Sequence, residues 1–159
     1  MNSYHEIVPP RASEVAQRLI FNTLWSHVPK KSIISGLWLR EYENTPLFPN
    51  CFLHVLPVAK FKYFRHYLRN IILVTPGEKG LWEQGKEEER IQYALDFEDK
   101  TKGRCTAEWG KIKTLEAELL LDYKKYFPST VGMLMDYHYS LHKQQLIIGA
   151  LNKKFLESL

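Results

Sequence analysis

Cysteine is scarce in this chain of 159 residues, and its two cysteines, Cys51 and Cys105, are too few for a disulfide framework. Neither belongs to a Cys-x-x-Cys pair that could bind zinc. Long hydrophobic runs are missing too, because none approaches the ~20 apolar residues of a membrane span. The opening MNSYHEIVPPRASE has no apolar core of secretory length. We therefore expect a cytoplasmic protein without a membrane partner.

The overall composition is typical of a folded globular protein. Hydrophobic residues make up 45%, aromatic residues 13% and charged residues 25% of the chain, which argues against disorder. A chain of this length most often forms one domain and can bury roughly 68 to 70% of its unfolded surface. Internal repeats and low-complexity tracts are absent from the sequence. We expect residues 1–159 to fold as a single domain.

Basic charge is concentrated in one part of the sequence. The net charge of +4 is only a mild bias. Residues 58–70, however, contain four basic residues and no acid, whereas residues 83–99 contain seven acids and only two basic residues. The basic residues of the first segment are Lys60, Lys62, Arg65 and Arg69.

Two short apolar segments flank this basic stretch and predict a small antiparallel sheet. CFLHVLP, residues 51–57, ends at a proline, and NIILV covers residues 70–74. Thr75 and Pro76 then give an N-cap and a first helical residue, which predicts a helix over TPGEKGLW. Upstream, residues 31–42 indicate a strand or hairpin arm with a turn at Ser35-Gly36.

Helical periodicity dominates the rest of the chain. Residues 13–28 and 86–99 predict two helices, and apolar residues at steps of three and four from Trp109 to Tyr126 predict a third. A terminal helix follows in residues 140–159. Its expected buried side consists of Leu146, Ile147, Leu151 and Phe155. The predicted fold class is α+β, a small β-hairpin and helix embedded in flanking α-helices.

The middle of the chain resembles the HNH family of nucleases, in particular its short phage-type members. The resemblance rests on FLHVLPVAKFKYF, NIILV and TPGEKGLW. The family pattern is Phe-x-His-Ile/Val-Leu-Pro-Lys-x-x-Tyr-Pro, then Asn-Ile-Val-Leu, then Thr-Pro-x-Glu-His. It extends over roughly residues 24–126, but only the middle third has specific motifs. The resemblance implies a ββα-metal core at about residues 31–84, with a helical remainder at about 86–159.

The resemblance also implies roles for individual residues. His54 matches the histidine that activates water at the end of the first strand, and Asn70 matches the asparagine that fixes the loop backbone. Lys79 stands where relatives have the third signature histidine, a metal ligand, and Leu53 stands where metal-binding members often have Asp or His. A divalent metal, Mg²⁺, Mn²⁺ or Zn²⁺, is expected from the family, but a protonated lysine would repel it.

Each candidate residue also has a plainer interpretation. His54 has a pKa range suited to a general base, but a histidine at a strand end can simply bond to the backbone. Asn70 is structural under either interpretation. The basic loop residues Lys60, Lys62, Arg65 and Arg69, mixed with aromatic residues, fit phosphate contacts, or a solvated face over an aromatic cluster.

Two further metal sites are conceivable. Glu78 and Glu83 flank Lys79 and could bind a cation together with His54, although Glu78 beside Lys79 also fits a solvated helix pair. His138 and His142 have the i, i+4 spacing of a helical metal site, or form a surface pair.

These features give two functional hypotheses. The first is a phage or mobile-element HNH-like endonuclease that hydrolyses phosphodiester bonds in nucleic acid, with DNA as the expected partner. The second is a catalytically degenerate relative that binds nucleic acid or a protein partner.

Overall fold

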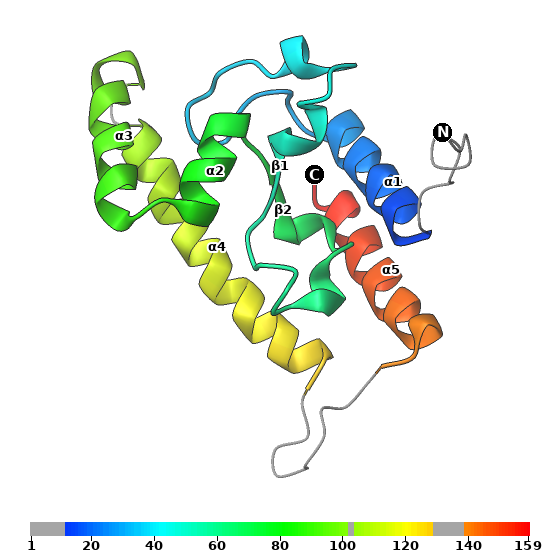
Figure 1. Ribbon diagram of the computed structural model, residues 1–159. Coiled ribbons are helices and arrows are strands. Elements are labelled where there is room, and N and C mark those ends of the chain that lie inside the picture. The colour runs from blue at the N-terminus through cyan, green and yellow to red at the C-terminus, as the bar shows by residue number, and fades with distance from the viewer. Residues whose placement is uncertain (1–11, 102–103, 129–138) are drawn as a thin grey trace, which may run out of the picture.

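The computed structural model describes residues 12–101, 104–128 and 139–159, and it confirms the α+β class (Figure 1). Seven regular elements are present in these ranges. They are α1 (Ala12–His27), β1 (Phe52–His54), β2 (Ile71–Leu73), α2 (Pro76–Gln84), α3 (Glu87–Thr101), α4 (Arg104–Tyr126) and α5 (Leu141–Glu157). Four short 3-10 helices lie in the connections, at Arg40–Tyr42, Phe48–Cys51, Lys62–Phe64 and Leu68–Asn70.

The predicted sheet is confirmed as an antiparallel pair in which Phe52 lies opposite Leu73 and His54 opposite Ile71. Side chains alternate between the two faces of a strand. Phe52, Ile71 and Leu73 accordingly belong to one buried cluster, whereas Leu53 and Ile72 belong to the other. The two strands are thus apolar on both faces, and helix residues cover each face, with α5 contributing to both clusters.

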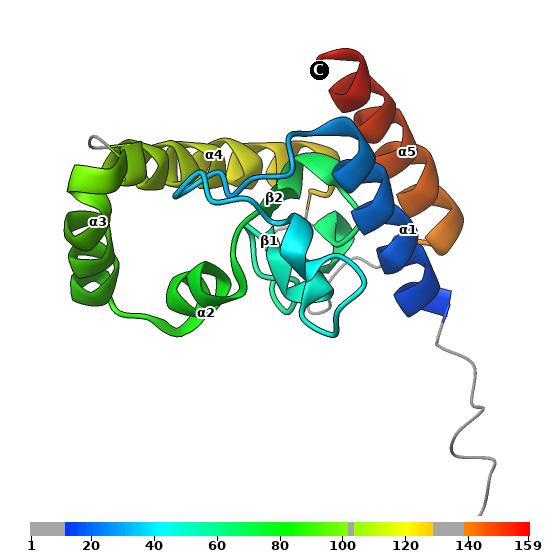
Figure 2. The same cartoon turned by 90° about the horizontal axis from the view of Figure 1, so that it is seen from above.

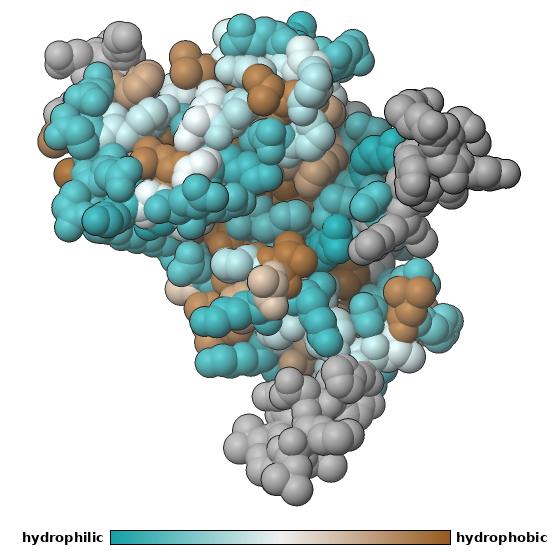
Figure 3. Space-filling view, viewed as in Figure 1, coloured by the Kyte–Doolittle hydropathy of each residue, from teal (hydrophilic) through white to brown (hydrophobic). Residues whose placement is uncertain are grey.

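The helices lie on two sides of this sheet (Figures 1 and 2). One cluster joins the sheet to residues of α1 and to the end of α5, and these two helices lie side by side in both views. The other cluster includes Trp82 of α2 with Trp109, Ile112 and Leu119 of α4. Helices α3 and α4 pack against each other. On the face seen in Figure 1, hydrophobic residues form separate patches on a mostly polar surface (Figure 3).

The predicted start of α2 is confirmed in detail. Thr75 is the N-cap, and its side chain accepts a hydrogen bond from the Glu78 amide, while the Glu78 carboxylate accepts one from the Thr75 amide. This reciprocal capping box satisfies two backbone donors that a helix start leaves free. It fixes where along the chain α2 begins.

The hairpin arm before β1 is also present in part. Lys31 and Trp38 form an isolated antiparallel bridge, and Gly36 has a φ of 76°, which a glycine adopts at no steric cost. The Ile33 amide donates to the Leu73 carbonyl at 2.9 Å, so this arm is tied to the end of β2 by one backbone hydrogen bond.

The predicted buried side of α5 is wrong at one position. The Leu146 side chain is 61% exposed, and Ile148 is buried instead, at 7%. The two residues flank Ile147 on opposite sides of the helix, and packing against the rest of the molecule selects the Ile148 side. His138 lies outside the described residues. In the described ranges, helices that are both long and apolar enough to cross a membrane are absent.

Candidate functional site

His54 ends β1 and its imidazole is held by the loop that follows. The ring Nε2 lies 2.9 Å from the Arg65 carbonyl oxygen. Because a carbonyl only accepts, Nε2 must carry the proton, and the neutral ring then has its lone pair on Nδ1. Burial is the largest of the effects that together lower the pKa of His54 to about 4; the positive charges of Lys79 and Arg65 act in the same direction, and the hydrogen bond to the Arg65 carbonyl opposes them. His54 is therefore neutral at pH 7.

Helix α1 supports the strand that positions His54. The Phe21 ring stacks on Phe52 with a centroid distance of 4.2 Å and lies 6.1 Å from the His54 ring. Stacked aromatic rings fix each other's orientation. The end of β1, with His54, is thus supported by Phe21 of α1, which lies more than thirty residues earlier in the sequence.

Asn70 fastens both ends of the loop between the strands. Its side chain is fully buried, and its Oδ1 accepts a hydrogen bond from the Leu56 amide at 2.8 Å. Its Nδ2 donates to the carbonyls of Leu56 at 3.2 Å and Phe64 at 3.3 Å. One amide side chain thereby satisfies three backbone groups of the loop.

Lys79 lies on α2, close enough to His54 for its charge to lower the pKa of the imidazole. Its side chain is half-buried, and its ammonium group forms no hydrogen bond or ion pair with the residues that the structure describes. Glu83, four residues further along, shares the same helix face and lines a groove with His54. Lys79 thus contributes a positive charge that acts on the imidazole and forms no ion pair with the described residues.

The residues around His54 do not fit the divalent metal that the HNH resemblance implies. Glu78 is fully buried, and its carboxylate accepts hydrogen bonds from Ser32 at 2.5 Å and Tyr93 at 2.6 Å. These donors and the Thr75 amide occupy the oxygens that a cation would need. Across the described ranges, no cluster of three His, Cys, Asp or Glu residues could hold a metal ion.

A groove of about 990 Å³ begins at His54 and runs between the 55–61 loop and the helices α2, α3 and α4. Its loop side includes Lys60 and Phe61. Its helix side is lined by Trp82, Glu83, Arg90, Lys113, Glu116 and Leu120. Its volume is larger than that of the other two pockets lined by predicted site residues.

The four basic residues of the loop are used in two different ways. Lys60 and Lys62 are exposed. Arg65 donates from Nε to the Gln17 side chain at 3.2 Å. Arg69 forms ion pairs with Glu118 and, at 3.0 Å, with Asp122. Two lysines are therefore presented to solvent, and two arginines join the loop to α1 and α4.

The aromatic residues of the loop pack internally. Tyr63 stacks on Phe127 with a centroid distance of 4.8 Å, and Phe61 and Phe64 meet Tyr123 edge to face at 5.1 and 4.9 Å. These contacts hold the loop on the C-terminal part of α4. The geometry of these aromatic side chains is that of a packed cluster beneath the loop.

Sequence reasoning did not identify the helical wall of the groove. Trp82, Arg90 and Lys113 come from three different helices and meet there. For Trp82 the sequence does give a signal, because it predicts that α2 follows β2 directly and so places this helix next to the sheet. Arg90 and Lys113 carried no local signal, since their position depends on how α3 folds back on α4.

Comparison with known proteins found no match for this chain among family models, curated proteins or solved structures. The HNH resemblance therefore rests on the motif residues alone and stays a prediction.

Proposed function

We propose that this protein is an HNH-like endonuclease that hydrolyses phosphodiester bonds in nucleic acid, DNA in the first instance, of phage or mobile-element type. The observation that carries the proposal is the state of His54. Its imidazole is neutral, its Nε2 proton is bound to the Arg65 carbonyl, and its Nδ1 is left as a proton acceptor in a ring whose pKa the charge of Lys79 helps to lower.

In this mechanism His54 Nδ1 takes a proton from water, and the resulting hydroxide attacks phosphorus while the P–O bond to the leaving sugar oxygen breaks. Negative charge then grows on the phosphate oxygens and on the leaving oxygen. The Lys79 ammonium group stabilises that charge. The leaving oxygen takes up a proton from solvent, and the His54 imidazolium releases its proton to solvent. The negative phosphate also raises the pKa of His54 from its low resting value, which makes the imidazole a better base when substrate is bound.

Asn70 is a positioning residue in this proposal, because it holds the loop whose carbonyl orients His54. Lys60 and Lys62 contact the phosphate backbone, since both side chains are exposed. Arg65 and Arg69 contribute mainly by holding the loop, because their guanidinium groups already have protein partners.

A second candidate function is a nucleic-acid-binding module that has lost catalysis. It is favoured by one observation, the presence of Lys79 where the resemblance places a metal ligand, in surroundings that lack a three-residue ligand set among the described residues. This protein would keep the loop and groove and bind without cutting.

The two candidates are separated by a cleavage assay on supercoiled plasmid and single-stranded DNA. The assay includes chelator alone, Mg²⁺, Mn²⁺ and Zn²⁺, and compares wild type with His54→Gln, Lys79→Met and Lys79→His. Lys154→Met, an exposed lysine of α5 far along the chain, is the matched control.

The nuclease proposal expects wild-type cutting that His54→Gln and Lys79→Met each reduce by about 100-fold or more, as for a lost base or charge-stabilising group. Cutting that survives His54→Gln contradicts the mechanism. Cutting that appears only in Lys79→His with a metal supports the degenerate binding module.

Binding is measured separately from cutting. Each of Lys60→Ala and Lys62→Ala is expected to lower the slope of log affinity against log salt by about 1, as for one lost phosphate contact. Arg69→Met is expected to leave that slope unchanged. An equal change in all three variants would contradict the division between exposed and paired cations.

A further inference from the structure

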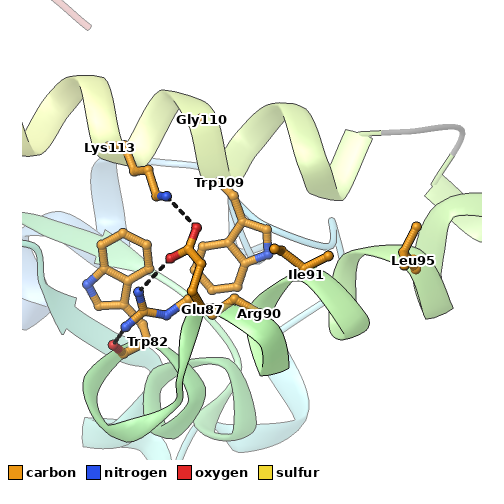
Figure 4. A pocket seen from close by; sticks show the side chains of 8 residues that line it. All are labelled: Trp82, Glu87, Arg90, Ile91, Leu95, Trp109, Gly110 and Lys113. Carbon is orange, nitrogen blue, oxygen red and sulfur yellow. Dashed lines mark hydrogen bonds and ion pairs between the residues drawn. The ribbon is translucent and has the colours of Figure 1, made fainter.

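A second, smaller pocket adjoins the His54 groove between α2, α3 and α4 (Figure 4). Its volume is about 270 Å³. Trp82, Arg90 and Lys113 line both the pocket and the groove. The two spaces are therefore neighbours that share one wall, and a molecule in the groove passes the mouth of the pocket.

The walls of the pocket are aromatic and aliphatic. Trp82 and Trp109 stack with a centroid distance of 5.1 Å and an angle of 9° between the rings. Ile91 and Leu95, one turn apart on α3, complete the lining and are 53% and 54% exposed. Exposed apolar side chains around a concave site are typical of a binding surface.

One hydrogen-bond donor at this wall has no partner. The Trp109 side chain is 7% exposed, and its Nε1 makes no hydrogen bond within the part of the chain that the structure describes. In Figure 4 this nitrogen lies on the edge of the indole that faces Ile91. A buried donor without a partner costs about 1 to 3 kcal/mol. A ligand with an acceptor at its ring edge would satisfy it once the exposed Ile91 side chain, which this nitrogen faces, turns aside.

Gly110 adds a steric argument. It lies inside α4, where a glycine costs about 1 kcal/mol relative to alanine, and it lines the pocket. A Cβ at this position would meet nothing within 4 Å. The protein alone therefore has no steric need for glycine at position 110, whereas an occupant of the pocket would.

The mouth of the pocket carries an excess of positive charge. Glu87 pairs with Lys113 at 2.7 Å and with Arg90 at 3.7 Å, so two cations share one carboxylate. The Arg90 guanidinium also lies 4.6 Å from the centre of the Trp82 ring. The site thus combines an apolar slot, a ring-edge donor and a cationic rim.

We propose that this pocket takes a single unpaired nucleobase of a nucleic-acid strand lying in the His54 groove. A flat ring with acceptors on its edge matches the slot and the Trp109 donor, and the phosphate attached to it would replace the exposed Glu87 carboxylate as the partner of Arg90 and Lys113. The volume suits one ring system, because pockets for larger ligands start at about 300 Å³. The inference rests on one part of the proposed function, that a nucleic-acid strand binds in the His54 groove. It does not require that the protein cleaves this strand.

The test uses two fluorescently labelled single strands of equal length, an oligothymidylate and an abasic strand with the same phosphates. Gly110→Leu places a side chain at the pocket from a position where a Cβ meets nothing within 4 Å, and it removes a helix-interior glycine, so it should not lower thermal stability. Ala117→Leu enlarges an exposed side chain elsewhere on α4, at a position that lines neither the pocket nor the groove, and is the matched control.

Wild type and Ala117→Leu should bind the oligothymidylate about five-fold or more tightly than the abasic strand, as expected for one stacked base. Gly110→Leu should bind both strands equally. A wild type that binds both strands equally or binds neither, or a Gly110→Leu variant that keeps the preference, overturns the pocket.

Cleavage is scored independently of this preference. Cutting without a preference for bases overturns the pocket and leaves the proposed function in place. A preference that Gly110→Leu abolishes, in a protein that never cuts, overturns the proposed nuclease and leaves the base pocket in place.

Discussion

Protonation of His54 should make the folded protein less stable in mild acid. In the unfolded chain the pKa of a histidine is near 6.5, whereas burial lowers the pKa of His54 in the folded protein to about 4. Between these two values the unfolded state binds a proton that the folded state does not. The contribution of His54 to stability is therefore complete above pH ~6.5 and is lost as the pH falls toward ~4.

The size of the effect follows from the two pKa values. At about 1.4 kcal/mol for each pH unit, His54 should contribute a loss of about 2 kcal/mol at pH ~5 and about 3 kcal/mol at pH ~4. This is a large fraction of the about 5 to 15 kcal/mol that stabilises a typical domain.

The assay is urea unfolding, followed by tryptophan fluorescence, from about pH 7 to about pH 4 for wild type and His54→Gln. Glutamine does not titrate and keeps a donor for the Arg65 carbonyl. Carboxylates titrate in both proteins, so the difference between the two curves isolates His54. Parallel curves over this range would refute a neutral, buried imidazole and, with it, the base that the proposed mechanism needs.

Three substitutions test the remaining framework by the same unfolding assay at neutral pH. Asn70→Ala should lower the free energy of unfolding by about 3 kcal/mol, because three loop hydrogen bonds are lost in a buried place; a loss below about 1 kcal/mol would contradict its role as the loop anchor. Glu78→Ala should cost about 3 kcal/mol, because it removes the carboxylate half of the capping box and the acceptor of Ser32 and Tyr93; an unchanged start of α2 in hydrogen exchange would contradict this. Arg69→Met should cost only about 1 kcal/mol or less, since its ion pairs are partly exposed; a larger loss would show that they act as a buried network.

The strands and the start of α2 could be predicted from sequence because their causes are local. Phe52 to His54 and Ile71 to Leu73 are apolar runs bounded by clear breaks. Thr75 and Pro76 form a start signal that acts within one helical turn. Asn70 was placed correctly at the junction of loop and strand, and its hydrogen bonds lie within fifteen residues of it.

The features that were missed depend on distant partners. Leu146 and Ile148 are equally apolar neighbours of Ile147, and only the position of the rest of the molecule decides which one is buried. The basic loop residues all carry the same charge, and the sequence does not show which of them has a partner. Arg69 pairs with Asp122, which lies more than fifty residues later in the chain. Periodicity predicts which residues share a helix face, and it does not predict what that face meets.

The position of Lys79 is set by its neighbour and not by its own chemistry. Glu78 is locked at the third position of α2 by the Thr75 cap and is buried against Ser32 and Tyr93. The next residue must then leave the helix about 100° further round, on the face that carries Glu83 into the His54 groove. Since Lys79 forms no ion pair with the described residues, Lys79→His changes the chemistry at this point without removing a contact that holds the fold. A gain or loss of metal-dependent cutting in that variant therefore reports on the reaction itself.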